Sequence, residues 1–207
     1  PVRRTKVWHV EPAAQRLSDY LSGTAPIDRP AQTISRLVSD DLPPLEDLAI
    51  GGHPARTGGA SAVAVMIGGL FLVYRGVVRF RIPLLMLASC YLTLGLLPMP
   101  TVVGHDEVTR SWLVPFNPRV GWAIGVTLIN YILCASPILL TTLIIAVLPG
   151  IRPIGLRAGV IYAVVFGVLC GACTVLVSFD YGAVLAVVIA QFLVPTLDRR
   201  LPSKATI

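Results

Sequence analysis

The chain has 207 residues, of which 55% are hydrophobic and only 14% are charged, and its mean hydropathy is +0.76. A water-soluble globule of this length needs more polar surface than this composition provides, so an ordinary soluble domain is excluded and an integral membrane protein is indicated. The formal charge of +6 comes from arginines that cluster beside apolar segments. That pattern is typical of membrane topology signals, so the positive charge does not indicate a nucleic-acid partner.

Residues 1–57 differ in kind from the rest of the chain. They hold seven acidic and seven basic residues and are interrupted by Pro26, Pro30, Pro43, Pro44 and Pro54. We expect an exposed extramembrane segment of loops and short helices, with one amphipathic turn at 33–38. Residues 58–207 are expected to form a separate transmembrane domain. Because the segment has no secretory signal, an outward N-terminus would require preceding membrane helices in a longer precursor or a separate chain. The alternative is the opposite orientation.

Five stretches are long and apolar enough to cross a hydrocarbon core of about 30 Å, which takes about 20 helical residues. They cover residues 60–78, 82–99, 120–148, 154–177 and 181–197. Their apolar runs are continuous and do not alternate, which predicts an all-α membrane protein of about five helices. Pro137 interrupts the third stretch, so we expect this span to be bent or discontinuous and buried against its neighbours.

Basic residues gather on one side of these spans. The connections at 75–81 and 152–157 and the tail at 198–204 contain one acid, Asp198, and eight basic residues: Arg75, Arg79, Arg81, Arg152, Arg157, Arg199, Arg200 and Lys204. The rest of the chain contains nine basic and ten acidic residues. The positive-inside rule therefore places the N-terminus and the loop at 100–119 outside and the C-terminus in the cytoplasm.

Four strings resemble successive landmarks of the RnfD/NqrB family: SGTAPID (22–28), LPPLEDLAIGGHPARTGGASAVAVMIGG (42–69), LFLVYRGVVRFRIP (70–83) and FLVPTLDR (192–199). Members of this family are membrane subunits of ion-translocating ferredoxin:NAD and NADH:quinone oxidoreductases. They have ten helices and carry FMN on a threonine of an S-G-A-T motif, on the outer side before the second five helices. The resemblance implies a bacterial inner-membrane protein that corresponds to this second half. Its partners would be the lipid bilayer and other subunits, and it would not be an enzyme on its own.

The flavin motif departs from the family pattern, because Ser22-Gly23-Thr24-Ala25 places alanine where the family has its flavin-bearing threonine. A phosphoester needs a hydroxyl, so Ala25 cannot carry FMN. Thr24, with Ser22 beside it, is the cofactor-binding candidate if the loop shifts by one residue. The alternative is a turn in which Ser22 or Thr24 satisfies local backbone groups.

Two acids of the family are also replaced. By the same resemblance, Gly59 stands where the family has a glutamate and Ser136 where it has an aspartate. Ionisable groups inside a membrane are costly and mark functional sites, so their replacement weakens the case for flavin or ion chemistry.

Four cysteines, Cys90, Cys134, Cys170 and Cys173, lie inside the predicted spans. Thiolates could hold an iron–sulfur cluster, but the Gly/Ala-rich surroundings of Cys170 and Cys173 favour helix packing. His9, His53 and His105 stand singly in predicted loops, which indicates no metal site.

Two functions from different classes follow. The first is a flavin-associated electron-transfer subunit of an Rnf/Nqr-like oxidoreductase, with FMN as its cofactor. The alternative is a non-catalytic structural or accessory transmembrane subunit of a larger complex. In either case we expect partner helices to cover part of its apolar surface, with Gly68, Gly69, Gly167 and Gly171 permitting close approach.

Overall fold

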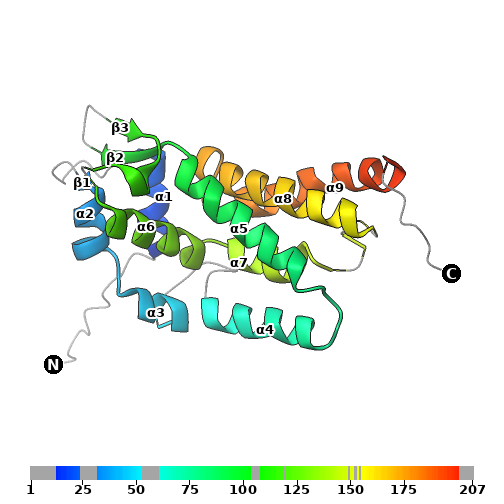
Figure 1. Cartoon of the computed structure of the whole chain (residues 1–207). Helices are drawn as coiled ribbons and strands as arrows, with labels where there is room; N and C mark the ends of the chain where they lie inside the picture. The colour runs from blue at the N-terminus through cyan, green and yellow to red at the C-terminus, as the bar shows by residue number, and fades with distance from the viewer. Residues whose placement is uncertain are drawn as a thin grey trace, which may run out of the picture.

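A computed structural model of the chain describes residues 13–23, 32–52, 61–103, 108–118, 120–148, 150–151, 153 and 155–200. The longer helices run side by side along the molecule (Figure 1). They are α4 (Ala62–Tyr74), α5 (Arg81–Leu96), α6 (Trp122–Ala135), α8 (Leu156–Leu176) and α9 (Gly182–Arg200). Each of the five predicted apolar stretches overlaps one of them, which confirms the predicted helical membrane fold.

The helices differ in length. Within the described residues, α8 and α9 are each long and apolar enough to cross a membrane alone. A third span results if α6 is taken together with the short helices that follow it. With 13 and 16 residues, α4 and α5 are shorter than the roughly 20 residues that a straight crossing requires.

The third span is bent, as Pro137 predicts. After α6 come α7 (Ile138–Leu140) and the π-helical turn η3 (Thr141–Ile145). The direction of the chain bends by 68° between α6 and these two short elements. Pro137 has no N–H to donate to the carbonyl of Leu133, which is why the α-helical ladder stops there. Ser136 is only 1% exposed and Ile138 is fully buried, so the break lies against protein.

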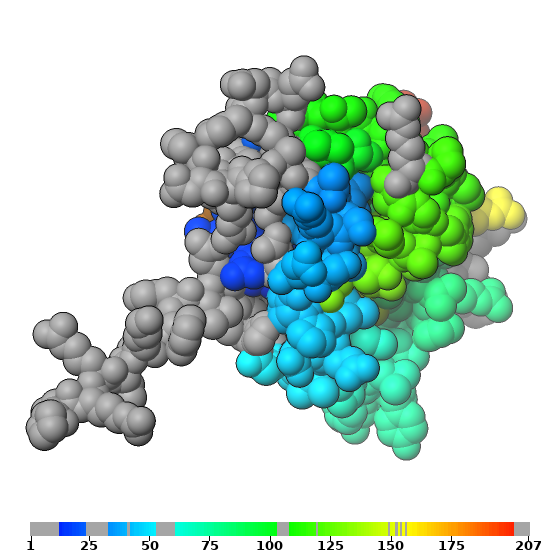
Figure 2. Space-filling view, turned by 90° about the vertical axis from the view of Figure 1, so that its left-hand side faces the viewer, coloured from blue at the N-terminus to red at the C-terminus, as the bar shows by residue number. Residues whose placement is uncertain are grey.

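A small sheet covers one end of the helices and was not predicted. It has the antiparallel order β1-β2-β3, formed by Gln32–Thr33, Met99–Val103 and Val108–Ser111. Around it lie α1 (Ala13–Ser22), α2 (Ile34–Arg36), η1 (Leu37–Asp41), α3 (Leu45–Ile50) and η2 (Val114–Phe116). Figure 2 views this end and shows η1 and α3 lying across it beside the green residues that follow the sheet. The predicted amphipathic turn at 33–38 is confirmed, because Ile34 and Leu37 are buried there.

One face of α1 is buried in the same hydrophobic core as the longer helices. Its buried residues, spaced three and four apart as a helix face requires, are Ala13, Ala14, Leu17, Tyr20 and Leu21. The Tyr20 hydroxyl donates to the carbonyl of Pro100 at the start of β2 (2.9 Å), and the Tyr131 hydroxyl of α6 donates to the carbonyl of Pro43 (2.7 Å). The first bond joins α1 to the sheet, and the second joins α6 to the segment before α3.

Small residues let α8 pack closely on its neighbours. A Cβ atom at Gly167 would overlap Ser89 Oγ and the carbonyl of Met86 on α5, and one at Gly171 would lie 3.1 Å from Cβ of Thr93. A Cβ atom at Gly182 of α9 would overlap the backbone of α8. Gly167 and Gly171 therefore serve contacts within the chain, which corrects the expectation that they admit partner helices.

Candidate functional sites

The candidate flavin motif begins where α1 ends. Ser22 is the last residue of α1, is exposed, and donates from Oγ to the carbonyl of Asp19 (3.0 Å). Gly23 follows with φ of 81°, a left-handed conformation that glycine adopts without strain at a helix end. A Cβ atom at Gly23 would lie 3.1 Å from Val108 Cγ2, so the motif starts against β3. Thr24 and Ala25 lie outside the described residues.

A polar cleft of about 450 Å³ lies on the same sheet. Hydroxyl and amide side chains form much of its wall, which is lined by Thr33, Ile34, Ser35, Thr101, Val102, Thr109, Ser111, Asn117 and Val120. Thr101 donates to the carbonyl of Thr109 (3.0 Å), whereas Ser111 Oγ is buried and has no hydrogen-bond partner among the described residues. The sequence analysis missed this cleft. Its signal is the alternation of hydroxyl residues along β3, at Thr109 and Ser111.

The break in the third span gathers buried hydroxyls. Thr141 donates to the carbonyls of Pro137 (3.0 Å) and Ile138 (2.9 Å), and Thr142 donates to the carbonyl of Ile138 (2.7 Å). Ser136 Oγ accepts from the N–H of Ile138 at 3.4 Å. Ser136, the position where the resemblance expects an acid, is thus used to support local backbone, as are both threonines.

Burial supports the packing interpretation of the cysteines. Cys90 on α5 and Cys170 on α8 are fully buried at the contact between these two helices, and Cys173 is 7% exposed. Cys134 is half-buried on α6. Gly171, one residue from Cys170, packs on the carbonyl of Cys90, so these thiols fill the space that close helix approach leaves.

Comparison with protein-family models matches residues 1–206 to the NQR2, RnfD, RnfE family. The chain belongs to this family. Its members are membrane subunits of electron-transport complexes of the Na⁺-NQR and Rnf types, so this protein is an RnfD/NqrB-like multi-pass membrane subunit. A search of curated proteins gave no match.

Of the two candidate flavin-site residues, the structure describes Ser22, whereas Thr24 lies outside the described part of the chain. Gly59 also lies outside it, whereas Ser136 is on α6's buried end. The residue at the position that corresponds to the family's flavin-bearing threonine does not fit covalent FMN, because Ala25 has no hydroxyl to form a phosphoester. The hydroxyl of Ser22 donates to the last turn of α1.

Proposed function

We propose that this chain is a structural membrane subunit of an Rnf- or Nqr-like electron-transport complex and carries no covalently attached FMN. The family match over residues 1–206 is the observation that carries the first part. Alanine at position 25, in place of the family's threonine, supports the second part.

The helix break supports a structural role. At this depth an ion or electron path would be expected to use ionisable or free polar groups. The buried hydroxyls of Thr141 and Thr142 instead donate to backbone carbonyls of their own helical turn. Their hydrogen bonds offset the loss that Pro137 causes in the helical ladder.

Charge supports an orientation in the bacterial inner membrane. The α4–α5 connection, the start of α8 and the end of α9 lie at one end of the helices (Figure 1) and hold, among the described residues, one acid and six arginines: Asp198, Arg75, Arg79, Arg81, Arg157, Arg199 and Arg200. The sheet end holds six acids and three arginines: Asp19, Asp40, Asp41, Glu46, Asp47, Asp180, Arg16, Arg36 and Arg110. We infer that the arginine end faces the cytoplasm. Residues 1–57 then form the outer extramembrane segment and residues 58–207 the membrane domain.

The outer face of α9 is proposed as a contact for other subunits. Val184, Val188 and Phe192 recur every four residues and are 46%, 56% and 78% exposed, which makes an apolar stripe along the helix. Purification of the tagged chain from its own membranes in a mild detergent should bring other membrane subunits with it. A photo-crosslinking residue at Val188 should capture one of them. A stable, monodisperse monomer with no crosslinked partner would contradict the assembly role.

A second function, electron transfer through FMN on Thr24, is favoured by the exposed position of Ser22 at the proposed outer end of the molecule. In that case a flavin transferase would have to accept a hydroxyl one residue earlier than in the family motif. Flavin fluorescence of the denatured chain in a gel separates the two functions, because only a covalent adduct stays with the chain.

A further inference from the structure

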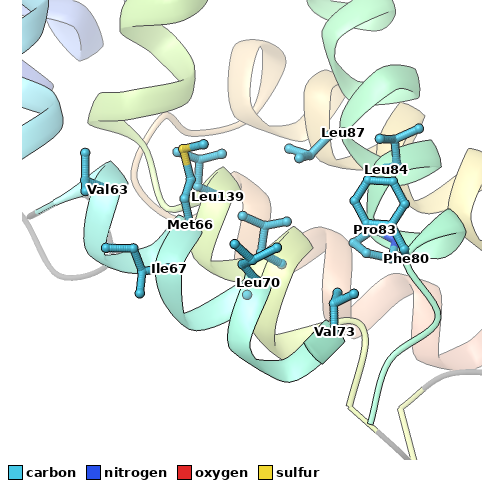
Figure 3. Close-up of a pocket in the computed structure, with 12 residues that line it drawn as sticks. Val63, Met66, Ile67, Leu70, Val73, Phe80, Pro83, Leu84, Leu87 and Leu139 are labelled. Atoms are coloured by element: carbon cyan, nitrogen blue, oxygen red, sulfur yellow. The ribbon is translucent and has the colours of Figure 1, made fainter. Parts of the chain in front are cut away.

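The helix α4 stands apart from α5 across an apolar groove. Gly69 of α4 packs closely on η3, where a Cβ atom would lie 3.1 Å from Cβ of Leu143. Beyond this contact, a groove of about 430 Å³ separates α4 from α5. Figure 3 shows Val63, Met66, Ile67, Leu70 and Val73 of α4 on one side, and Pro83, Leu84 and Leu87 of α5 on the other.

The walls of the groove are made of hydrocarbon. Its twelve lining residues are glycine, proline, methionine, phenylalanine or aliphatic residues. Several are exposed to the surroundings, with Leu70 65% and Leu84 51% accessible, so the groove opens laterally toward lipid. An occupant must therefore be apolar along the length of α4.

One end of the groove is strongly basic. Val73 and Phe80 line the groove where α4 and α5 are joined, as Figure 3 shows. Arg75 follows Val73 by two residues, and Arg79 and Arg81 flank Phe80. All three guanidinium side chains are exposed, and the sequence from Arg75 to Arg81 contains no acid.

The backbone holds this connection in a defined shape. The N–H of Gly76 donates to the carbonyl of Val73 (3.0 Å) and the N–H of Val77 donates to the carbonyl of Leu72 (3.2 Å), which is a Schellman ending of α4. Gly76 has φ of 71°, the left-handed value that this motif needs. The backbone positions of the three arginines are thus set at the end of the groove, and the guanidinium of Arg75 lies over the ring of Phe71, 6.0 Å from its centroid.

We propose that this groove binds one anionic phospholipid, with an acyl chain between α4 and α5 and its phosphate at Arg75, Arg79 and Arg81. Guanidinium groups form charge-assisted, bidentate hydrogen bonds to phosphate oxygens, and basic sites next to membrane helices select anionic headgroups. An acyl chain matches the long, apolar groove. A partner helix fits less well, because its apolar face would leave the three exposed arginines without an anionic group, whereas a phospholipid supplies both an apolar chain and a phosphate.

The test uses the full chain purified in detergent and titrated by native mass spectrometry with dioleoyl phosphatidylglycerol or dioleoyl phosphatidylcholine, which differ only in the headgroup. The wild type should bind the anionic lipid more tightly. Changing Arg75, Arg79 and Arg81 to glutamine should weaken that binding by about fivefold per arginine. Arg157→Gln with Arg199→Gln and Arg200→Gln, which removes three charges at the same end, is the matched charge control and should leave it unchanged.

A second pair of variants tests the groove itself. Leu84→Trp, which fills the groove from an exposed position, should weaken binding of both lipids, whereas Ile161→Trp, at a position of α8 that is 44% exposed and outside the groove, should not. The proposal is overturned if the two arginine sets have equal effects, if the wild type shows no headgroup preference, or if Leu84→Trp binds like the wild type. It is also overturned if a co-purifying subunit occupies the groove and excludes the lipid.

Discussion

Tyr20 shows how a single side chain joins the N-terminal helix α1 to the strand β2 that follows α5. It is 2% exposed and donates to the carbonyl of Pro100, 80 residues away in the sequence. Burial raises the pKa of the Tyr20 hydroxyl above its usual value, so it remains a donor at pH values where an exposed tyrosine would ionise.

Replacing Tyr20 by phenylalanine leaves the carbonyl of Pro100 without this donor, so the free energy of unfolding should fall by about 1 kcal/mol at neutral pH. The folded-state pKa of Tyr20 is raised, so the unfolded chain loses its proton first. The stabilisation is therefore complete below about pH 10 and declines as pH rises above it. Thermal unfolding in detergent at several pH values should show a steeper alkaline loss for the wild type than for Tyr20→Phe. Tyr181→Phe, at a position 72% exposed, serves as control. Equal alkaline slopes for wild type and Tyr20→Phe would contradict this assignment.

Elements with strong hydrophobic signals could be predicted from the sequence, and weaker ones could not. The apolar stretches could be predicted from their continuous hydrophobicity, and the break could be predicted because Pro137 lacks a backbone N–H. The hairpin of β2 and β3 is short and lies in a mixed connection, so it has no recognisable pattern. The residues of α1 do have the spacing of a helix face, but the mixed charge around them favours an exposed segment of loops and short helices. The Ser22 position could be predicted from its motif, but the cleft near Ser111 depends on pairing between distant strands.

The π-helical turn after the break depends on its hydroxyls. Changing both Thr141 and Thr142 to valine keeps their shape and removes donors to carbonyls at a fully buried site, so the free energy of unfolding should fall by about 1–3 kcal/mol. Thr127→Val serves as control, since Thr127 makes the same kind of bond, to the carbonyl of Ala123 (2.8 Å), at a partly exposed position. Thermal stability in detergent measures both. Equal, small losses would mean that the break needs no hydroxyl support.

The α5–α8 contact makes a second prediction at the scale of elements. Gly167→Ala forces a Cβ atom into Ser89 and the backbone of Met86 and should cost about 1–3 kcal/mol of stability. Gly159→Ala on the same helix face meets only the flexible end of Ile82, at 3.4 Å, and should be close to neutral. Similar midpoints for the two variants would show that α5 and α8 are farther apart than described.

At the scale of the whole molecule, the proposed orientation places the two ends on opposite sides of the membrane. Tyr74→Cys, beside the arginines, and Tyr181→Cys, at the turn between α8 and α9, place thiols at positions 85% and 72% exposed. In sealed inner-membrane vesicles of known orientation, a membrane-impermeant reagent should label only one of them from each side. Labelling of both from the same side would contradict the orientation. The native cysteines are a low background, because three of the four are buried.

The family could be predicted from the sequence because its landmarks are contiguous strings, and the match over residues 1–206 confirms it. Whether this member carries the family's cofactor depends on one hydroxyl near Ala25. Intact-mass measurement of the chain released from its native membrane assembly tests this most directly. We predict the mass of the unmodified chain, with no fluorescent adduct. An addition with the mass of a phosphoester-linked FMN, abolished by Thr24→Ala, would contradict the structural role and restore the electron-transfer function.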